Sequence, residues 1–521
     1  MAERPQLSAE LIERLVAALD ADRVVTDAAA VDEHKDPYYI PGDDSFLASA
    51  VVFPTCAEDV QEIIKLASEF EVPVWPHGQG RNYGYGGPSP AERGSIQISF
   101  HRMNRILEID EELAYAVVEP GVRWFDLYEA IEAEGYDLLL SVPDLGWGSP
   151  IGNSLDNGVS YHQNGQNFMA LHGLEVVLAD GSLMRTGMGA MPDNPAFHLY
   201  PRGLGPVVEG LFFQGNYGIV VRAGVWLKRK PEAYAALSLV LKTDAELEQG
   251  VEALRELMIE GSLEGVPSMY TTLTAAPQLL DDEVLPPGVL SEEQIQEIAD
   301  RTGIGRWAVR TAVWNRRDRI EQQIARVKEV WEAIPGARVD VSPIYAKEDY
   351  PKLTLSAEQI QAGIPTLQLI EATPPNFGHI GFSPIVPMTG SQVRFVYDRM
   401  KAGIEAAGVN FLGGLLVINE RSTVLVTGVP FNTTDQEQAE RAFTAIRGLV
   451  EELGREGYGE YRAHLDFMDL AQEQYSFGDH AYRRFAETLK DAVDPKGIIM
   501  PGRHGIWGTA ARARRAARQE Q

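Results

Sequence analysis

Cysteine is nearly absent from this chain of 521 residues, which has only Cys56 and therefore no internal disulfide. A small fold held by disulfides is excluded, and the composition is typical of a reducing cytoplasm, where we expect the protein. The sequence also lacks a signal-peptide core and any apolar run long enough to cross a bilayer, so we expect no membrane partner. We expect Cys56, near the start of a helix, to be a small buried apolar residue.

Basic residues are also scarce. The chain has 46 Lys and Arg against 75 Asp and Glu, a formal net charge of -29. Sequence-independent binding of nucleic acid needs a net basic surface, so we expect no nucleic-acid partner. Arg512, Arg514, Arg515 and Arg518 do gather near the C-terminus, where we expect a frayed and solvated helix end. The ten histidines show no metal-ligand spacing, so we expect no metal site.

The chain does have enough apolar sequence for two or three packed cores, since 45% of its residues are hydrophobic. Residues 8–19 predict a helix, and Thr55 and Glu58 form a capping box ahead of an apolar stripe at helical spacing. Short apolar runs predict strands, and the pair Asp180-Gly181 predicts a hairpin turn. The predicted strands are 72–75, 96–100, 115–119, 414–418 and 422–428. Further helices are predicted at 244–257, 292–300 and 482–492, which makes the pattern α+β.

A glycine-rich loop follows the strand at 72–75: Gly78-Gln79-Gly80-Arg81-Asn82-Tyr83-Gly84-Tyr85-Gly86-Gly87. Its exposed backbone N–H groups would line a concave site for a pyrophosphate. The alternating glycines and Pro88 prevent a helix from starting inside the loop, so this is not the common dinucleotide fingerprint. Taken alone, the loop fits a mobile surface turn equally well, but its two interleaved tyrosines favour a binding site.

Three further patches carry candidate chemistry. Pro143-Asp144-Leu145-Gly146-Trp147-Gly148 places one carboxylate in a weakly polar setting, where burial beside an aromatic cofactor would suit it to proton transfer; a turn aspartate is the alternative. In Gly378-His379-Ile380-Gly381-Phe382-Ser383-Pro384, two glycines let the histidine backbone approach a flat ring system. Gly459-Glu460-Tyr461-Arg462 sets a phenol beside a guanidinium, which indicates either recognition of a planar anion or a plain surface pair.

Together, these four patches resemble the vanillyl-alcohol oxidase and eugenol oxidase family of flavoproteins, which binds FAD and oxidises para-substituted phenols. The similarity covers most of the chain and is densest between residues 51 and 220. It implies an α+β fold of the vanillyl-alcohol oxidase (PCMH) type, with a two-part FAD-binding domain and an inserted α+β cap domain. The implied boundaries are 1–229 for the FAD-binding domain, 230–462 for the cap or substrate-binding domain, and 463–521 for a C-terminal segment that returns to the FAD-binding domain.

The resemblance also assigns roles to individual positions. The residues that would hold FAD are Gly78, Gln79, Gly80, Arg81, Asn82, Tyr83, Pro143, Gly148, Ser149, Gly152, Asn153, Asp156, Gly158, Ile219, His379 and Arg503. Among them, His379 would bond covalently to the flavin 8α-carbon. The implied catalytic residues are Tyr85, Tyr461 and Arg462, which bind the phenol as its anion, and Asp144, the acid/base near flavin N5. Tyr161, Gly381, Ser383 and Gly413 would line the substrate pocket.

This chain departs from the family pattern in three places. Asn164-Gly165-Gln166-Asn167 replaces Tyr-Gly-Asp-His, which predicts a pocket of another shape. Arg503 stands where relatives have a lysine, so the charge is kept with a different geometry. Gly413 and Gly414 align with a bulkier pocket residue of eugenol oxidases, which predicts a roomier cavity.

The resemblance predicts hydride transfer from the benzylic carbon of a small phenolic substrate to flavin N5, through a para-quinone methide, with molecular oxygen as acceptor. The substrate would be of the vanillyl alcohol, eugenol or 4-alkylphenol type. A dehydrogenase of the 4-cresol type, which passes electrons to a cytochrome, is the first alternative, although its flavin is carried by a tyrosine and His379 favours an oxidase. An oxidase of aliphatic alcohols or hydroxy acids would have no use for two tyrosines and an arginine around an anion. A non-catalytic binding protein is the last alternative, and we expect a homodimer or a higher homo-oligomer.

Overall fold

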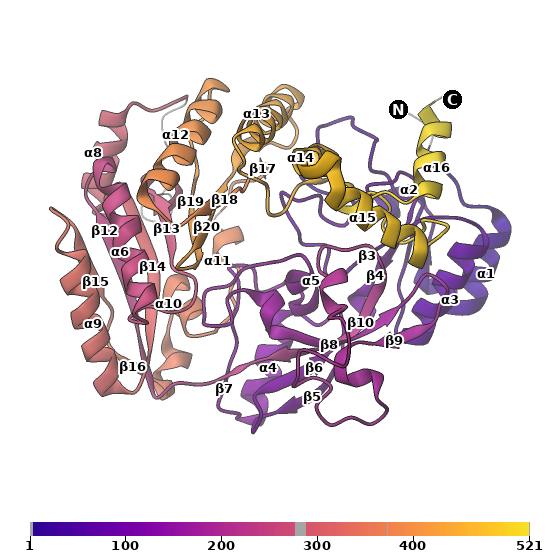
Figure 1. Cartoon of the computed structure of the whole chain (residues 1–521), viewed down its shortest axis with the longest axis horizontal. Coiled ribbons are helices and arrows are strands. Elements are labelled where there is room, and N and C mark those ends of the chain that lie inside the picture. Colours follow the sequence, from indigo (N-terminus) through magenta and orange to yellow (C-terminus); the bar gives the residue numbers. More distant parts are fainter. Residues whose placement is uncertain (1–3, 277–287, 372, 520–521) are drawn as a thin grey trace.

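The chain forms two parts and a C-terminal segment in a computed structural model, which describes residues 4–276, 288–371 and 373–519. In Figure 1 the first part lies on the right and the second part, with its large sheet, lies on the left. The C-terminal helices lie above the first part. Helices and sheets are mixed in both parts, which confirms the α+β class.

Four strands form the first sheet, in the order β1-β2-β4-β3, with β2, β4 and β3 parallel. Their bounds are β1 (Val24–Val25), β2 (Ala50–Val52), β3 (Val74–His77) and β4 (Ile96–Ser99). Helices α1 (Ala9–Leu19), α2 (Ala28–Asp32) and α3 (Ala57–Glu69) belong to the same region. The predicted helix α1 begins after Ser8, whose hydroxyl accepts a hydrogen bond from the Leu11 backbone N–H at 3.2 Å. Its apolar stripe is buried in one core with that of α3, and each buried side chain of this kind contributes about 1.5–3 kcal/mol.

Helix α3 begins one residue later than its capping pattern predicts. Its N-cap residue is Cys56, which makes no side-chain cap and is half-buried rather than fully buried. Asp59, rather than Glu58, accepts hydrogen bonds from the Thr55 backbone N–H and hydroxyl, each at 2.8 Å. Asp59 also pairs with Arg23 at 2.6 Å. The predicted capping box of Thr55 and Glu58 is therefore wrong, because Asp59 satisfies these donors.

A second, antiparallel sheet completes the first part, in the order β5-β6-β10-β8-β9. Its strands are β5 (Ile106–Asp110), β6 (Tyr115–Val118), β8 (Leu171–Val177), β9 (Leu183–Arg185) and β10 (Ile219–Trp226). The Asp180-Gly181 pair lies in the hairpin between β8 and β9, as predicted, and Gly181 has a φ of 80° that favours glycine. Helices α4 (Trp124–Glu134) and α5 (Pro150–Leu155) lie in the long connection between β6 and β8.

The second part is built on an eight-stranded sheet in the order β15-β12-β14-β13-β19-β20-β18, with β16 also paired to β12. Its strands are β12 (Ala233–Leu241), β13 (Ser268–Thr271), β14 (Trp307–Asn315), β15 (Arg338–Val341), β16 (Tyr345–Ala346), β18 (Ile385–Pro387), β19 (Gly413–Asn419) and β20 (Ser422–Thr427). Helix α6 contacts both α9 and α12, which in turn contact the strands. The helices are α6 (Leu247–Ile259), α8 (Glu292–Thr302), α9 (Arg317–Trp331), α12 (Gly390–Ala406) and α13 (Gln436–Arg455). A separate two-stranded ribbon pairs β17 (Phe377–Ile380) with β21 (Val429–Asn432) and carries His379.

The C-terminal segment returns to the edge of the first sheet. The Val74 backbone N–H of β3 donates to the Ile498 carbonyl at 2.8 Å, and the Met500 N–H donates to the Val74 carbonyl at 2.9 Å. This segment contains α14 (Met468–Gln474), α15 (Phe477–Val493) and α16 (Thr509–Gln519). The remaining elements are β7 (Leu138–Leu139), β11 (Lys228–Arg229), α7 (Thr272–Ala275), α10 (Ser356–Gln361) and α11 (Gln368–Glu371).

The arginines of α16 hold this helix against the rest of the protein. Arg514 and Arg518 both pair with the buried carboxylate of Glu92, at 3.1 and 3.3 Å. Arg512 pairs with Glu487 and Arg515 with Asp469, each at 2.7 Å. The helix end is solvated as expected, but the expected fraying is wrong, because these ion pairs dock the helix.

The predicted domain boundaries fall between elements of the structure. The first lies between β11 and β12, and the second lies between Arg462 and the short helix Leu465–Phe467. The division into 1–229, 230–462 and 463–521 stays a prediction. Within the described ranges, no helix is both long and apolar enough to cross a membrane.

Candidate active site

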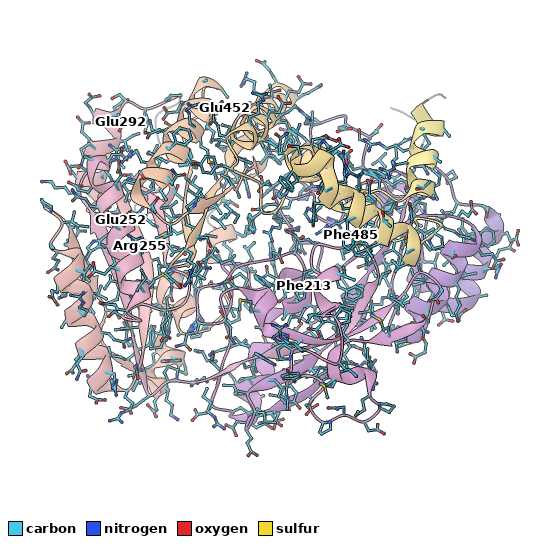
Figure 2. All side chains as sticks on the ribbon, in the orientation of Figure 1. Phe213, Glu252, Arg255, Glu292, Glu452 and Phe485 are labelled. Atoms are coloured by element: carbon cyan, nitrogen blue, oxygen red, sulfur yellow. The ribbon has the colours of Figure 1, made fainter. Side chains whose placement is uncertain are left out.

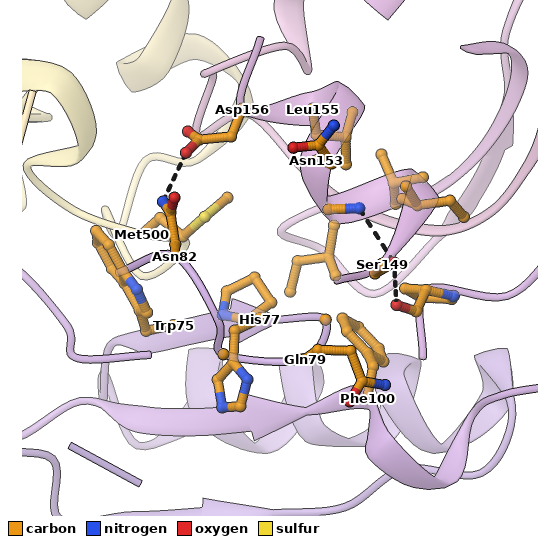
Figure 3. Close-up of a pocket in the computed structure, with 18 of the residues that line it drawn as sticks. Trp75, His77, Gln79, Asn82, Phe100, Ser149, Asn153, Leu155, Asp156 and Met500 are labelled. Atoms are coloured by element: carbon orange, nitrogen blue, oxygen red, sulfur yellow. Dashed lines mark hydrogen bonds between the residues drawn. The ribbon is translucent and has the colours of Figure 1, made fainter. Parts of the chain in front are cut away.

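A cavity in the first part is lined by the glycine-rich loop, helix α5, the start of β10 and the C-terminal segment (Figure 3). Most residues that the sequence predicts to hold FAD converge on its wall. They are Gly78, Gln79, Gly80, Arg81, Asn82, Gly148, Ser149, Gly152, Asn153, Asp156, Ile219 and Arg503. Four of the predicted residues do not line this cavity: Tyr83, Pro143, Gly158 and His379. Arg462, predicted to bind the substrate, lines it as well.

The glycine-rich loop is fixed from several sides. A Cβ on Gly78 would come within 2.9 Å of the Pro120 carbonyl oxygen, so the backbone passes too closely for any other residue. Gln79 Nε2 donates to the Gly121 carbonyl at 2.5 Å. The Arg81 guanidinium lies 4.5 Å from the ring centre of Trp147 and donates to the Tyr83 hydroxyl at 2.8 Å. These contacts exclude the alternative of a mobile surface turn.

The opposite wall of the cavity is braced from behind. The Ser149 hydroxyl donates to the Pro120 carbonyl at 2.6 Å and caps α5 by accepting from the Gly152 N–H at 3.2 Å. Asn153 Nδ2 donates to Asn167 Oδ1 at 3.0 Å. A Cβ on Gly158 would lie 2.0 Å from Asn153 Oδ1, so this glycine allows the close approach. Gly158 therefore acts behind the wall, through Asn153.

Asp156 binds the positively charged side chains at one end of the cavity. Its carboxylate contacts Arg503 closely, lies 3.6 Å from Arg462 Nη1 and accepts from Asn82 Nδ2 at 2.7 Å (Figure 3). Burial opposes ionisation of Asp156, but Arg503 and the neighbouring cations together lower its pKa below the usual value. Arg503 and Arg462 are thus held by one anion that remains charged.

Tyr85, Tyr461 and Arg462 are brought together as the sequence predicts. The Arg462 guanidinium lies 3.9 Å from the ring centre of Tyr85 and 5.5 Å from that of Tyr461. Burial raises the pKa of Tyr461 well above 10, so its hydroxyl keeps its proton and can donate. Burial alone would lower the pKa of Arg462, but Tyr461, Tyr85 and Asp156 raise it above its usual value. The group is one fixed cation between two phenol rings, which we call the clamp.

Asp144 lies in a cluster that the sequence analysis did not find. Arg310, from β14 of the second part, binds its carboxylate through two hydrogen bonds, Nη1 to Oδ1 at 2.9 Å and Nη2 to Oδ2 at 3.2 Å. The Tyr161 hydroxyl donates to the same carboxylate. Burial, and then the Asp144 charge, raise the pKa of Tyr161 well above 10. The expected weakly polar setting is therefore wrong, because Asp144 belongs to a half-buried ion pair.

One signal in the sequence points to Arg310. It is the one charged residue in the stretch Trp-Ala-Val-Arg-Thr-Ala-Val-Trp of β14. A charge in so apolar a strand needs a buried partner. Its guanidinium also lies 4.2 Å from the Tyr161 ring centre and 5.9 Å from that of Tyr270. Arg310 therefore connects the eight-stranded sheet of the second part to the Asp144 loop of the first part.

His379 reaches the glycine-rich loop without lining the cavity. A Cβ on Gly84 would come within 2.9 Å of His379 Nε2, so the imidazole lies directly against the loop backbone. The Tyr38 ring lies 5.1 Å away. Burial lowers the pKa of His379 to about 4, with a smaller opposing effect of Asp36, so the ring is neutral at physiological pH.

Glu460 connects the segment that follows β17 to the clamp, a role that the sequence analysis missed. Its buried carboxylate accepts from the Ser383 backbone N–H at 3.1 Å and from the Arg462 N–H at 3.3 Å. The Tyr461 N–H donates to the Ser383 carbonyl at 3.2 Å. Gly381 packs against β20, where a Cβ would lie 2.2 Å from the Thr427 carbonyl oxygen. Gly381 and Ser383 thus lie beside the clamp as parts of its support.

Of two predictions about pocket shape, the one for Gly413 needs correction and the one for residues 164–167 stays a prediction. A Cβ on Gly413 would lie 2.4 Å from the Val426 carbonyl oxygen and 2.9 Å from the Phe411 ring, so the space beside Gly413 is filled and offers no roomier cavity. In the divergent segment, Asn164 Nδ2 donates to the Trp226 carbonyl and Gln166 Nε2 donates to the Ile418 carbonyl. These amides, like that of Asn167, are used in internal hydrogen bonds.

Comparison with known proteins gives this site its context. Residues 48–187 match a family model described as an FAD binding domain. The chain is 31% identical to the 4-cresol dehydrogenase [hydroxylating] flavoprotein subunit of Pseudomonas putida, over 88% of each chain. The structure matches 4-ethylphenol oxidase from Gulosibacter chungangensis, in complex with isoeugenol, with a TM-score of 0.92, 34% identity, and coverage of 97% of this chain and 99% of that one. It matches p-cresol methylhydroxylase with substrate bound at a TM-score of 0.90 and 28% identity, over 97% and 99% of the two chains.

These matches and the two-part fold define an FAD-dependent oxidoreductase. The chain belongs to the vanillyl-alcohol oxidase and 4-cresol dehydrogenase family of flavoproteins, as its four sequence patches predict.

The residues around the cavity fit FAD. The close backbone at Gly78 leaves room that a side chain would fill, and Trp75, Phe100 and Ile219 offer apolar surface for planar rings.

Proposed function

We propose that this protein oxidises para-substituted phenols of the 4-alkylphenol, eugenol or vanillyl alcohol type, with FAD as cofactor and molecular oxygen as acceptor. The observation that carries the proposal is the clamp, a buried arginine between two tyrosine rings. An aliphatic alcohol offers no anion to this arrangement, and the carboxylate of an aliphatic hydroxy acid has no aromatic ring to place beside the two tyrosines. Family membership supports phenol oxidation as the chemistry.

The clamp favours binding of the phenol as its anion. A free phenol has a pKa of roughly 10, and one nearby buried cation with a hydroxyl donor shifts this value toward neutrality. Asp156 neutralises Arg462 only in part, because its closer contact is with Arg503. Tyr461 keeps its proton and donates to the phenolate oxygen. The substrate is therefore held ionised and in one orientation.

Ionisation makes the benzylic carbon a hydride donor. Bound FAD supplies the acceptor for that hydride. An electron pair of the phenolate oxygen enters the ring as the hydride leaves, and the substrate becomes a neutral para-quinone methide. Water then adds at the benzylic carbon while Asp144 accepts its proton; alternatively, the adjacent carbon loses a proton to give an alkene. A benzylic alcohol loses its hydroxyl proton instead and gives an aldehyde.

Arg310 and Tyr161 hold Asp144 for this proton transfer. The two hydrogen bonds from Arg310 fix the plane of the carboxylate and balance its charge in a buried site. Tyr161 donates a third hydrogen bond. We assign Asp144 as the acid/base, with Arg310 and Tyr161 as positioning residues.

Arg462→Met tests the clamp directly. The wild-type protein should bind 4-fluorophenol, which has no benzylic carbon to oxidise, as the phenolate, which the ultraviolet difference spectrum shows by its shifted absorption band. Without the guanidinium, the phenol should bind as the neutral form and at least tenfold more weakly, since one charge-assisted contact contributes about 1.5–3 kcal/mol. Arg399→Met is the matched control, because Arg399 lies 5.1 Å from the Phe395 ring centre on the cap. Phenolate binding at full strength in Arg462→Met would overturn the role of the clamp.

We propose that FAD is covalently attached through the neutral imidazole of His379, whose ring lies against the FAD-binding loop. His379→Ala should fold and bind FAD, and acid precipitation should then release the yellow cofactor into the supernatant. In the wild-type protein and in His198→Ala the colour should stay with the precipitate. Colour retained in the His379→Ala precipitate would contradict this attachment.

A dehydrogenase acceptor is the second candidate, because a relative at 31% identity is a 4-cresol dehydrogenase flavoprotein subunit. The same clamp and acid/base would serve it without change. We propose oxygen because the His379 patch resembles that of the oxidases. A cytoplasmic location and a homodimer or higher homo-oligomer are also proposed.

A further inference from the structure

A second cavity lies behind the clamp, between the C-terminal helices and the first part of the fold. It encloses about 480 Å³ and is separate from the cavity proposed for FAD. Helices α14 and α15 form one side, and the segments around Phe168 and 210–217 form the other. In Figure 1 these helices lie directly over the first part, and Figure 2 shows Phe485 on α15 and Phe213 below it.

Aromatic side chains line both sides of this cavity. Phe168 and Phe213 meet edge to face with ring centres 6.2 Å apart. On the other side, Tyr475 and Tyr482 lie with ring centres 6.2 Å apart, next to Phe485. Tyr482 and Phe485 are 62% and 64% exposed, so the aromatic lining continues to the surface. Aromatic walls of this kind stack on a planar ring and contribute about 0.5–1.5 kcal/mol per pair beyond burial.

The floor of the cavity is the back of the clamp. Glu460, Tyr461 and Arg462 line it, and Gln214, Gly215 and Arg462 line both this cavity and the one proposed for FAD. Gln214 Nε2 donates to the Tyr461 carbonyl at 2.8 Å, which fixes the common wall. Two buried donors that line the cavity have no partner among the described residues: Arg462 Nε on the floor and Gln472 Nε2 on α14. Burial raises the pKa of Glu460 to about 8, so at neutral pH Glu460 adds little negative charge to the floor.

We propose that this second cavity is an outer binding site for the phenol, through which the substrate reaches the clamp. The inference rests on the proposed function and adds the path of the substrate. A neutral phenol is held between the aromatic walls with its hydroxyl toward the unpaired donors Arg462 Nε and Gln472 Nε2. The hydrogen bond from Gln214 to the Tyr461 carbonyl breaks as the phenol passes Tyr461, and the phenol ionises on the far side of Arg462.

Gly210 offers a way to fill this cavity without disturbing its walls. It lines the cavity, its φ is not in the left-handed region, and a Cβ placed on it meets no atom within 4 Å. A tryptophan at this position therefore has space to extend over the mouth. Gly448 on α13 is the matched control, since its Cβ also meets no atom and it lies outside the cavity.

The test is the rate of binding of 4-fluorophenol, a phenol without a benzylic carbon, followed by the flavin absorption in stopped flow without air. A blocked route slows entry and exit equally and leaves the equilibrium unchanged. Gly210→Trp should therefore lower both the association and the dissociation rate constants at least tenfold, with the dissociation constant within a factor of two. Gly448→Trp should behave as the wild type. Unchanged rate constants in Gly210→Trp would overturn the proposal, as would a weaker equilibrium with an unchanged association rate.

The outcome separates this inference from the proposed function. If the wild type binds 4-fluorophenol through the second cavity but 4-ethylphenol does not reduce the flavin, the route stands and phenol oxidation fails. If 4-ethylphenol reduces the flavin equally fast in both tryptophan variants, oxidation stands and the route fails. If the wild type does not bind 4-fluorophenol, the outer site is excluded.

Discussion

At the scale of single residues, the site contains two groups of paired charges that serve different functions, one around Asp156 and one around Asp144. In the clamp, the cation is in excess, because Arg462 shares Asp156 with Arg503. At the acid/base, the charges are matched one to one, because Arg310 binds both oxygens of Asp144. The first arrangement attracts an anionic substrate, and the second keeps a proton acceptor in place.

Replacement of Arg310 tests the second pair. In Arg310→Met, Asp144 loses its counter-charge and the two hydrogen bonds that fix the plane of its carboxylate. Water addition should slow about 10–100-fold, while flavin bleaching by 4-ethylphenol changes little, since hydride transfer does not use Asp144. Arg310→Lys should recover part of the rate of water addition, since it restores the charge without the paired geometry.

The measurement compares the rate at which hydroxylated product forms from 4-ethylphenol with the rate of flavin bleaching. Arg316→Met, at an exposed arginine just beyond β14, is the control. An equal loss of both rates in Arg310→Met would show that the arginine has a purely structural role.

The sequence reveals these residues unequally. Tyr85, Asp144, Tyr461 and Arg462 are found because each lies in a short patch with a chemical pattern of its own. Arg310 is not found because its partner is 166 positions away, so the strand shows a charge that needs a partner without showing which one. Gly413 was interpreted as added space because a sequence does not show that a neighbouring carbonyl fills the volume beside a glycine.

At the scale of elements, the clamp is held by segments that come together from three regions of the chain. The 383–385 segment pairs with 459–461 through backbone hydrogen bonds and the Glu460 carboxylate. Just after the clamp, His464 Nε2 lies 2.9 Å from Asp36 Oδ2 in the N-terminal region, and both side chains are buried. Asp36 also accepts from the Tyr38 N–H at 3.1 Å. The pair His464–Asp36 therefore anchors the C-terminal side of the clamp.

This anchor predicts a pH dependence of stability. Burial opposes protonation of His464, but Asp36 and Asp466 raise its pKa to about 9, above the unfolded value of 6.5. A group whose pKa is raised in the folded state contributes its full stability below 6.5 and loses it as the pH rises through 9. Between pH 6.5 and 9 the free energy of unfolding should fall by on the order of 2 kcal/mol more in the wild type than in His464→Gln.

Denaturant unfolding at these two pH values measures the difference. The comparison with His464→Gln cancels the contribution of Glu460, which also titrates in this range. Parallel curves for the two proteins would mean that His464 is neutral in the folded state.

Most elements follow from local sequence, and the exceptions have causes that local sequence does not show. The helix predicted over 482–492 extends over Phe477–Val493, and Gly478, Asp479 and His480 at its start have left-handed backbone angles that periodicity does not show. The start of α3 was misassigned because Asp59 and Glu58 are both acidic, and only the position of Arg23 decides which one turns back. Such choices depend on partners distant in sequence.

At the scale of the whole molecule, the site exists only because three stretches of the chain meet. Arg503 contacts Asp156 across 347 positions, and Arg462 lies beside the same carboxylate from another segment. The fold type could be predicted from the sequence because the four patches resemble one family throughout. The second cavity could not be predicted, because it is formed where α14 and α15 close over the first part.

The central claim is tested most directly by mixing the oxidised protein, without air, with 4-ethylphenol and following the flavin absorption. We predict rapid bleaching, followed by return of the yellow colour and formation of hydrogen peroxide when air is admitted. Ethylbenzene, which lacks the phenol hydroxyl, should leave the flavin yellow, because the clamp has no anion to bind. If dithionite bleaches the flavin but neither 4-ethylphenol nor vanillyl alcohol does, the protein does not oxidise phenols of this class.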